Sequence, residues 1–429
     1  MTQTRLIPLL ALLLVGCPSS PTVDPDPDGG SGQNPTGPTF TVHAPSEVTS
    51  TFQLYRNVDV LLGDGSKYRA RLDSSGVVHF RDPAITGPQD VTLVMVRSTG
   101  TVEAKTYLAL NGPEVWLPSS LYLLGAIPFT KQGTITGKVT GASNPSNLSV
   151  TVAGNGLYGT TTLSEDGSFS IDIRGDAPGK VDLFAQETTG TEGTVVRVGL
   201  ARDIAVSAGT TVSGRDVALD HPVDQSFGVT VASGEIPDTT LNASLRYILG
   251  GRLLFGTSAS GTQPLSVPMI ARTAPFDTVT PMLRVSSGEA AKLPGGQVET
   301  NMPVSTGSSA QVTFLNPPSI TSPAVGTLED PPSASRAGLV LRWSPDASAH
   351  LTEVELAATI GPGPLDWTVV APADSAPVTT FPAGSYRVWA ATSWQANASG
   401  YASFFTGSLS SDPYVETRTT RLLTYVELQ

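Results

Sequence analysis

The chain has 429 residues, which is enough for three or four domains of ordinary size. It contains 43 glycines and 35 prolines but only 14 % charged residues, a balance typical of short strands joined by tight turns rather than of helices. The formal net charge is −12 and no run of Lys and Arg occurs, which argues against a nucleic-acid partner and against a polybasic membrane-binding patch. We therefore expect an all-β protein built of tandem β-sandwich domains.

The N-terminal residues carry the most specific pattern in the chain. Arg5 precedes an apolar run that ends in Leu14-Val15-Gly16-Cys17. This pattern resembles the signal peptide and lipobox of bacterial lipoproteins. The resemblance implies cleavage between Gly16 and Cys17, loss of residues 1–16, and attachment of lipid, including palmitate, to Cys17. An ordinary secretory signal also fits the charge-then-apolar layout, and a cytosolic chain is the remaining alternative. The run is too short to span a bilayer as a helix.

Residues 17–39, which begin at the lipidated Cys, are rich in Pro, Gly and Asp and have no apolar face to bury. We expect a disordered linker that spans about 26 Å as a flexible coil and about 68 Å as extended polyproline. Asp24, Asp26 and Asp28 imitate the start of a calcium loop, but Pro35 stands where such a loop needs a bidentate Glu. No metal ion or other cofactor is expected. Since Cys17 is the only cysteine, the domains cannot be held by disulfides.

A repeat of about 90 residues marks the first two domains, which we place at residues 40–131 and 132–220. Four positions of the first copy recur 91 residues later, and four more recur after 90 residues. The matched pairs are Gly63/Gly154, Gly65/Gly156, Leu72/Leu163, Gly76/Gly167, Val91/Val181, Leu93/Leu183, Thr99/Thr189 and Gly100/Gly190. Phe169, Ile171 and Ile173 alternate, which predicts one buried face of a strand. The Asp166-Gly167 pair before them predicts a turn in which Gly supplies the positive φ.

The second copy resembles the carboxypeptidase regulatory-like (transthyretin-like) β-sandwich. The likeness rests on GTITGKVTG at 133–141, EDGSFSI at 165–171, APGKVDLFA at 177–185 and VSAGTTVSGRDVAL at 206–219. It implies a seven-stranded sandwich without catalytic activity, which serves as a spacer or binding unit. Residues 40–131 would be a diverged copy.

Two further domains follow. Residues 221–313 have less definite strand patterns, and we assign them to a β-rich domain. Residues 314–429 contain LVLRWSP at 339–345 and AGSYRVWAA at 383–391, and they resemble a fibronectin type III domain. The resemblance implies that Trp343 and Tyr386 pack across the core. Alternation places Leu339 and Leu341 on the same face as Trp343.

No catalytic pattern emerges from the sequence. The four histidines, His43, His79, His221 and His350, are far apart and form no H-x-x-x-H or H-E-x-x-H motif. Neither a G-x-S-x-G elbow nor a phosphate-binding glycine loop occurs. We predict that the protein is not an enzyme and keep a hydrolase site assembled from distant segments as the least favoured alternative.

Four of the five tryptophans lie in the last domain. If Tyr386, Val388 and Ala390 face the core, Arg387 and Trp389 face outward, and Trp394 follows soon after. These three residues, Arg387, Trp389 and Trp394, form the candidate binding surface, because Trp beside Arg is typical of interaction hot spots. The favoured alternative is that the third and fourth domains pack together and bury the rings.

The leading functional hypothesis is a non-catalytic lipoprotein of the cell envelope, in which a lipid-anchored chain of β-sandwiches acts as a structural spacer or as a binding or adhesion module. Pro18 is not the Asp that retains lipoproteins in the inner membrane of enteric-type bacteria, which favours the outer membrane. The membrane would be reached through the lipid, and an envelope protein or glycan is the expected partner. Carbohydrate or cell-wall binding by the C-terminal aromatics is the alternative function.

Overall fold

A computed structural model describes residues 5–6, 39–45, 55–97, 100–118, 130–154, 156–175, 177–189, 193–234, 236–250, 252–291, 296–304, 307–358, 365–372, 377–379, 384–407 and 414–429. These residues form strands, turns and two short 3₁₀ helices and contain no α-helix, so the expectation of an all-β protein is confirmed. The expected signal peptide and linker lie outside the described residues, apart from Arg5–Leu6 and Thr39. Within the described parts, no helix has the length and apolar character needed to cross a membrane.

The strands group into four two-layered units. The first unit comprises β2 (Thr39–His43), β3 (Tyr55–Leu62), β4 (Tyr68–Arg71), β5 (Val77–Arg81), β6 (Gln89–Arg97), β7 (Val102–Leu110) and β8 (Glu114–Trp116). The second comprises β9 (Lys131–Thr140), the 3₁₀ turn η1 (Pro145–Asn147), β10 (Leu148–Ala153), β11 (Leu157–Leu163), β12 (Ser168–Gly175), β13 (Gly179–Thr189), β14 (Thr194–Val206), β15 (Thr210–Val212), β16 (Val217–Ala218) and β17 (His221–Pro222).

The third unit comprises β18 (Gln225–Ser233), β19 (Leu241–Leu249), β20 (Arg252–Gly261), β21 (Leu265–Met269), β22 (Thr280–Gly288), β23 (Gln297–Pro303) and β24 (Ser309–Thr313). The fourth comprises β25 (Ser319–Ser322), β26 (Ser333–Ala334), β27 (Leu339–Val340), β28 (Arg342–Ser344), β29 (Leu351–Ala358), β30 (Leu365–Ala371), β31 (Pro377–Thr379), β32 (Gly384–Gln395), the 3₁₀ turn η2 (Tyr401–Phe405) and β33 (Thr417–Leu428). The two-residue strand β1 (Arg5–Leu6) pairs in parallel with β31.

The first three units share one strand order. In each, the first strand pairs antiparallel with the fourth and parallel with the seventh, as β2 does with β5 and β8, β9 with β12 and β15, and β18 with β21 and β24. The second, fifth and sixth strands form the opposing sheet in all three. Of these seven strands, the third is placed differently: β4 and β20 join this opposing sheet, whereas β11 pairs with β12 on the other sheet. The second unit also has two further short strands, β16 beside β9 and β17 beside β14.

The sequence repeat matches this shared order. Gly63 and Gly154 each follow the second strand of their unit, and Gly76 and Gly167 each precede the fourth. Gly167 has φ +84°, which confirms the expected turn. The third unit has the same order without a repeat that we could detect in its sequence, because a strand order requires only alternating apolar positions and turns at suitable spacing.

Alternation along the strands accounts for the cores. Phe169, Ile171 and Ile173 are all buried in the second unit, as predicted. In the fourth unit Leu339, Leu341 and Trp343 are buried, while the intervening Arg342 is exposed. The burial of Trp343 and Tyr386 in one hydrophobic cluster confirms their predicted core positions.

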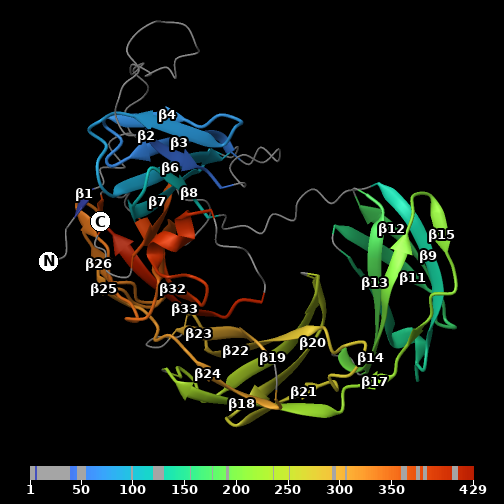
Figure 1. The fold of residues 1–429 in the computed structure, drawn as a ribbon. Coiled ribbons are helices and arrows are strands. Elements are labelled where there is room, and N and C mark those ends of the chain that lie inside the picture. The colour runs from blue at the N-terminus through green and yellow to red at the C-terminus, as the bar shows by residue number, and fades with distance from the viewer. Residues whose placement is uncertain are drawn as a thin grey trace, which may run out of the picture.

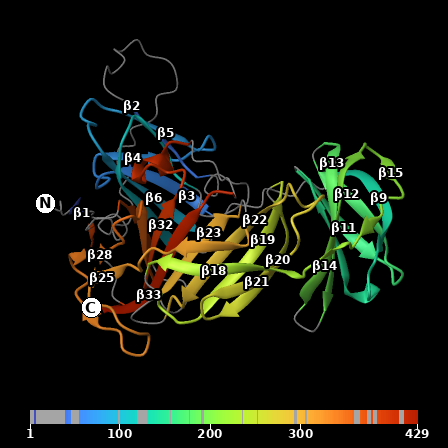
Figure 2. The same cartoon turned by 60° about the horizontal axis from the view of Figure 1, so that its bottom comes forward.

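Three of the units are joined by one continuous sheet of 13 strands, which is the main feature that the sequence did not reveal. Its path runs from the third unit through the fourth to the first, in the order β20-β19-β22-β23-β33-β32-β29-β30-β7-β6-β3-β4, with β26 beside β33. β23 pairs antiparallel with β33, and β30 pairs in parallel with β7 over residues 365–370 and 102–107. Edge strands that would otherwise present unpaired backbone groups are thus paired inside the molecule. Figures 1 and 2 show the fourth unit lying between the first and the third.

At this junction, each of the first and fourth units contributes side chains to the hydrophobic core of the other. Val370 and Phe405 of the fourth unit belong to the core of the first, while Ala104 and Leu108 of the first belong to the core of the fourth. The indole Nε1 of Trp367 donates a hydrogen bond of 3.0 Å to Thr106 Oγ1 across the junction. The two units therefore share buried surface as well as backbone pairing.

The second unit packs on the third through a patch of aromatic side chains. Phe184 stacks on Phe255, with 5.2 Å between the ring centroids, and meets Phe276 edge to face. Leu183 and Ala185, its neighbours on β13, face the core of the second unit itself. The four units together form an open arch, with the second unit at one end and the first at the other (Figure 1).

Candidate functional site

The predicted attachment and cleavage residues, Cys17 and Gly16, lie outside the described residues. The other predicted site residues, Arg387, Trp389 and Trp394, all lie on β32. Tyr386, Val388 and Ala390 are buried, so Arg387 and Trp389 share the opposite face of the sheet, as expected.

Trp394 lies on the other face from Trp389, because the two positions are five residues apart on one strand and side chains alternate between the faces. The guanidinium of Arg418 lies over its ring at 4.3 Å from the ring centroid, and the His350 ring lies 5.7 Å away. The structure therefore does not bring the two tryptophans onto one surface. Arg387 and Trp389 remain together.

The aromatic residues that follow Trp394 pack against the first unit. Phe405 lies in the core of that unit and meets Tyr107 edge to face at 5.8 Å. Tyr401 and Phe404 pack against the same cluster, and the Tyr401 hydroxyl donates to the Val370 carbonyl at 3.1 Å. A neighbouring unit packs against these three rings, but it is the first unit in sequence and not the third.

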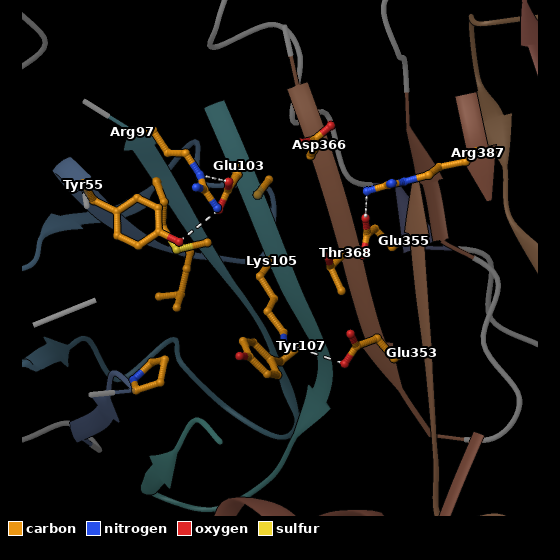
Figure 3. Close-up of a pocket in the computed structure, with 14 residues that line it drawn as sticks. Tyr55, Arg97, Glu103, Lys105, Tyr107, Glu353, Glu355, Asp366, Thr368 and Arg387 are labelled. Carbon is orange, nitrogen blue, oxygen red and sulfur yellow. Dashed lines mark hydrogen bonds and ion pairs between the residues drawn. The ribbon is translucent and has the colours of Figure 1, made fainter. Parts of the chain in front are cut away.

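A hollow of about 320 Å³ opens on the Arg387 face, where β7 of the first unit meets β30 of the fourth (Figure 3). Arg387 contributes to its lining from β32, and Glu355 contributes from β29. Trp389 lies directly across the ladder from Glu355, so its side chain is a cross-strand neighbour of one lining residue.

The hollow forms because one face of the large sheet is covered by a second sheet in the first unit but not where the first unit meets the fourth. On β3 and β6 this face carries Val60 and Leu93, which are buried beneath the sheet β5-β2-β8. The same row continues through Lys105 on β7 and Thr368 on β30, which line the hollow. The covering sheet of the fourth unit lies on the opposite face, over Val369 and Trp367. Polar side chains therefore occupy the face where the first unit's cover ends.

Three ion pairs cross the hollow. Arg97 pairs with Glu103, whose other oxygen accepts a 3.0 Å hydrogen bond from the Tyr55 hydroxyl. Lys105 Nζ lies 3.7 Å from an oxygen of Glu353. A guanidinium nitrogen of Arg387 lies 3.3 Å from an oxygen of Glu355. The hydrogen bond to Glu103 raises the pKa of Arg97, so its positive charge is held firmly.

Asp366 is the fourth carboxylate of the hollow. Its Oδ1 accepts a long, 3.4 Å hydrogen bond from the Ala358 amide, and no ion pair of 4 Å or less to it occurs among the described residues. Partial burial raises the pKa of this carboxyl, and the negative charge of Glu103, its direct neighbour across the β7–β30 ladder, raises it further. Figure 3 shows Asp366 between the Glu103 and Arg387 strands, with no dashed line to it.

Each of the four histidines has a polar contact away from this hollow. His43 Nε2 lies 2.6 Å from Glu114 Oε1, and its ring stacks on Trp116. His79 contacts Thr41 Oγ1 at 3.0 Å. The Gln395 amide donates to His350 Nδ1 at 3.4 Å, and burial lowers the pKa of His350.

His221 stands in a carboxylate–imidazole–hydroxyl series that the sequence search missed. Its Nδ1 lies 2.7 Å from Asp220 Oδ1, and its Nε2 lies 3.2 Å from Thr273 Oγ1, which is 52 positions away in the chain. The imidazole is buried against Phe276 where the second unit passes into the third. None of the three residues lines the hollow described above. The series therefore connects two units, and the Asp220-His221 dipeptide was its only sequence signal.

Among the described residues, no group of three or more His, Cys, Asp and Glu side chains is arranged to hold a metal ion. Neither a scan against protein-family models nor a search of curated proteins finds a match for this chain. The hollow itself carried no sequence signal beyond Arg387, since its other charged residues come from four further strands in two units.

Proposed function

We propose that this protein is a non-catalytic lipoprotein of the cell envelope, in which joined β-sandwich units form one scaffold that presents a recognition face. The observation that carries the proposal is the continuous sheet through three units. Paired edges and exchanged core residues give a body whose units hold a defined orientation, as a spacer or a binding platform requires.

The anchor would be the lipid on Cys17, followed by the linker at 18–39. Each buried methylene contributes about 0.8 kcal/mol to membrane affinity, so two acyl chains make release negligible. The proposed linker adds about 26–68 Å of reach, depending on how extended it is. Cleavage before Cys17 would remove β1, which contributes two residues at the edge of β31. The outer membrane remains our proposed location.

Small-angle scattering tests the scaffold part of the proposal. If the shared sheet holds in solution, the full chain should scatter as a single arched body, and its radius of gyration should not change between low and high salt. Units that move independently, like beads on a string, would scatter as a more extended particle with a broad distribution of distances. That result would contradict a rigid scaffold.

A second candidate function is glycan binding at Trp389, favoured by the partly exposed indole on the same strand face as Arg387 and across the ladder from Glu355. Such a site would rest on one tryptophan, since Trp394 lies on the other face beneath Arg418.

Separate alanine variants of the two tryptophans test this candidate. We expect Trp389→Ala to weaken retention of the protein on cell-wall polysaccharide roughly tenfold or more, because a Trp at a binding hot spot contributes about 2 kcal/mol. Trp394→Ala is the matched control and should leave retention unchanged. Affinity electrophoresis on immobilised polysaccharide measures both. Equal retention of wild type and Trp389→Ala would rule the site out.

A further inference from the structure

The charges around the hollow at the β7–β30 junction do not balance. Its lining holds four carboxylates and three basic groups. Each basic group already lies within 4 Å of one carboxylate: Arg97 of Glu103, Lys105 of Glu353, and Arg387 of Glu355. Asp366 is left over, and the ionised lining carries one net negative charge. An anion entering the hollow would therefore meet no unengaged positive group among the described lining residues.

The surroundings of Asp366 leave its negative charge poorly compensated. Burial and the repulsion of Glu103 both disfavour the carboxylate form, and the long hydrogen bond from the Ala358 amide offsets them only in part. Arg387 and Arg97 act on Asp366 only at longer range, because each is engaged with its own glutamate. A positive group placed beside Asp366 would relieve both unfavourable effects at once.

We propose that this hollow binds a compact organic cation, a primary ammonium or guanidinium group on a small polar ligand or a basic peptide side chain, with Asp366 as its counter-ion. The volume of about 320 Å³ is near the lower end for small-molecule sites, which suits one side-chain-sized group. Thr368 and Glu355, which also line the hollow, add oxygen acceptors for its N–H donors. The site goes beyond the proposed function and does not depend on the lipid anchor.

An organic cation fits this lining better than a metal ion does. Metal ions such as calcium need several oxygen ligands at once, and no such grouping of three acidic or histidine side chains occurs in the described part of the chain. A single ammonium or guanidinium needs one carboxylate and a few acceptors in a partly desolvated place. Asp366 and the neighbouring oxygens meet that requirement.

Calorimetric titration of the full chain tests the proposal. The probes are N-acetyl-lysine amide, N-acetyl-arginine amide and the neutral N-acetyl-norleucine amide, which keeps the apolar stem without the charge. We expect at least one cationic probe to bind at least tenfold more tightly than the neutral probe at pH 7.5. Affinity should fall as the pH is lowered through the raised pKa of Asp366, because protonation removes the counter-ion.

Variants of Asp366 separate binding from folding. Asp366→Asn should weaken binding of the cationic probe at least tenfold, and Asp366→Glu should retain part of it. Asp224→Asn, which changes an exposed acid just before β18, should bind as the wild type does. Because the folded state raises the pKa of Asp366, its ionisation opposes folding as the pH rises above the ordinary Asp value. Asp366→Asn should therefore melt no lower than the wild type at pH 7.5.

Three results would overturn the proposal: no binding of either cationic probe at 10 mM, equal binding of the neutral probe, or unchanged binding by Asp366→Asn. None of these results would bear on the lipid anchor or on the scaffold, which are measured by other means.

Discussion

Replacing Cys17 with Ala is expected to move this protein from the detergent phase to the aqueous phase and to abolish its labelling by fatty acid. A chain of 14 or more carbons contributes on the order of 10 kcal/mol of membrane affinity, at about 0.8 kcal/mol per buried methylene. The acidic chain has no basic run to hold it at the membrane in place of the lipid. Growth with a tagged palmitate analogue, followed by Triton X-114 partitioning, measures both effects.

Ser19→Ala is the matched control, since it changes a small residue near the cleavage site and leaves the thiol intact. It should be labelled and should partition as the wild type does. A chain that starts at Pro18 and is expressed without a leader provides the soluble reference, which guards against an uncleaved leader holding Cys17→Ala at the membrane. Fatty-acid label on Cys17→Ala, or an unlabelled wild type in the aqueous phase, would remove the anchor from the proposal.

Phe405→Ala is expected to destabilise the first unit although Phe405 belongs to the fourth. The ring is 3 % exposed in the core of the first unit and meets Tyr107 edge to face. Removing a buried Phe side chain typically costs about 3–5 kcal/mol. Local opening of the first unit should therefore become at least a hundredfold more frequent. Hydrogen exchange of the amides in β2 and β5 reports that opening directly.

Phe404→Ala provides the comparison, because the neighbouring ring is only partly buried against the same cluster. Its effect on exchange in β2 and β5 should be about 1 kcal/mol or less. The third unit serves as an internal reference, and exchange in β19 and β22 should be unchanged in both variants. Equal protection of β2 and β5 in the wild type and in Phe405→Ala would mean that the first unit does not depend on the junction.

Local features of the fold were predictable because they depend on neighbours in the chain. The buried face of Phe169, Ile171 and Ile173 followed from a period of two, and the positive φ of Gly167 followed from its turn. The core position of Tyr386 was an implication of the fibronectin type III resemblance, and the outward position of Arg387 followed from it by the same alternation. These features depend on the residues of the strand and its turns, and not on which other unit packs nearby.

Trp389 and Trp394 were predicted to share one binding surface, but they lie on opposite faces of β32. The reason for this error is also local. The prediction placed Trp389 by alternation but did not carry the alternation on to Trp394, five residues further along a strand that extends to Gln395. Strand length was the missing information, since a turn before Trp394 would have released the ring from the pattern. A strand of 12 residues places it on the opposite face.

The junctions between units could not be read from the sequence at all. The β7–β30 ladder joins segments more than 250 residues apart through backbone groups, which every residue except proline supplies in the same form. The hollow depends on this ladder, because its carboxylates and cations come from strands of two units. In the sequence Asp366 is an ordinary acidic residue near the start of a strand. In the structure β7 places Glu103 beside it, and the negative charge of Glu103 contributes to raising the pKa of Asp366.

The sequence by itself determined the all-β class, the alternating cores of the strands, and the position of the one thiol that we propose carries lipid. It did so because strand periodicity, turn glycines and an N-terminal signal are all encoded within a few consecutive residues. Only the tertiary structure decided that the fourth unit lies between the first and the third, which ring fills which core, and which carboxylate of the hollow has no ion-pair partner among the described residues. Those outcomes depend on which sheet edges pair and on where the covering sheet ends. Neither is encoded in a pattern of a few consecutive residues.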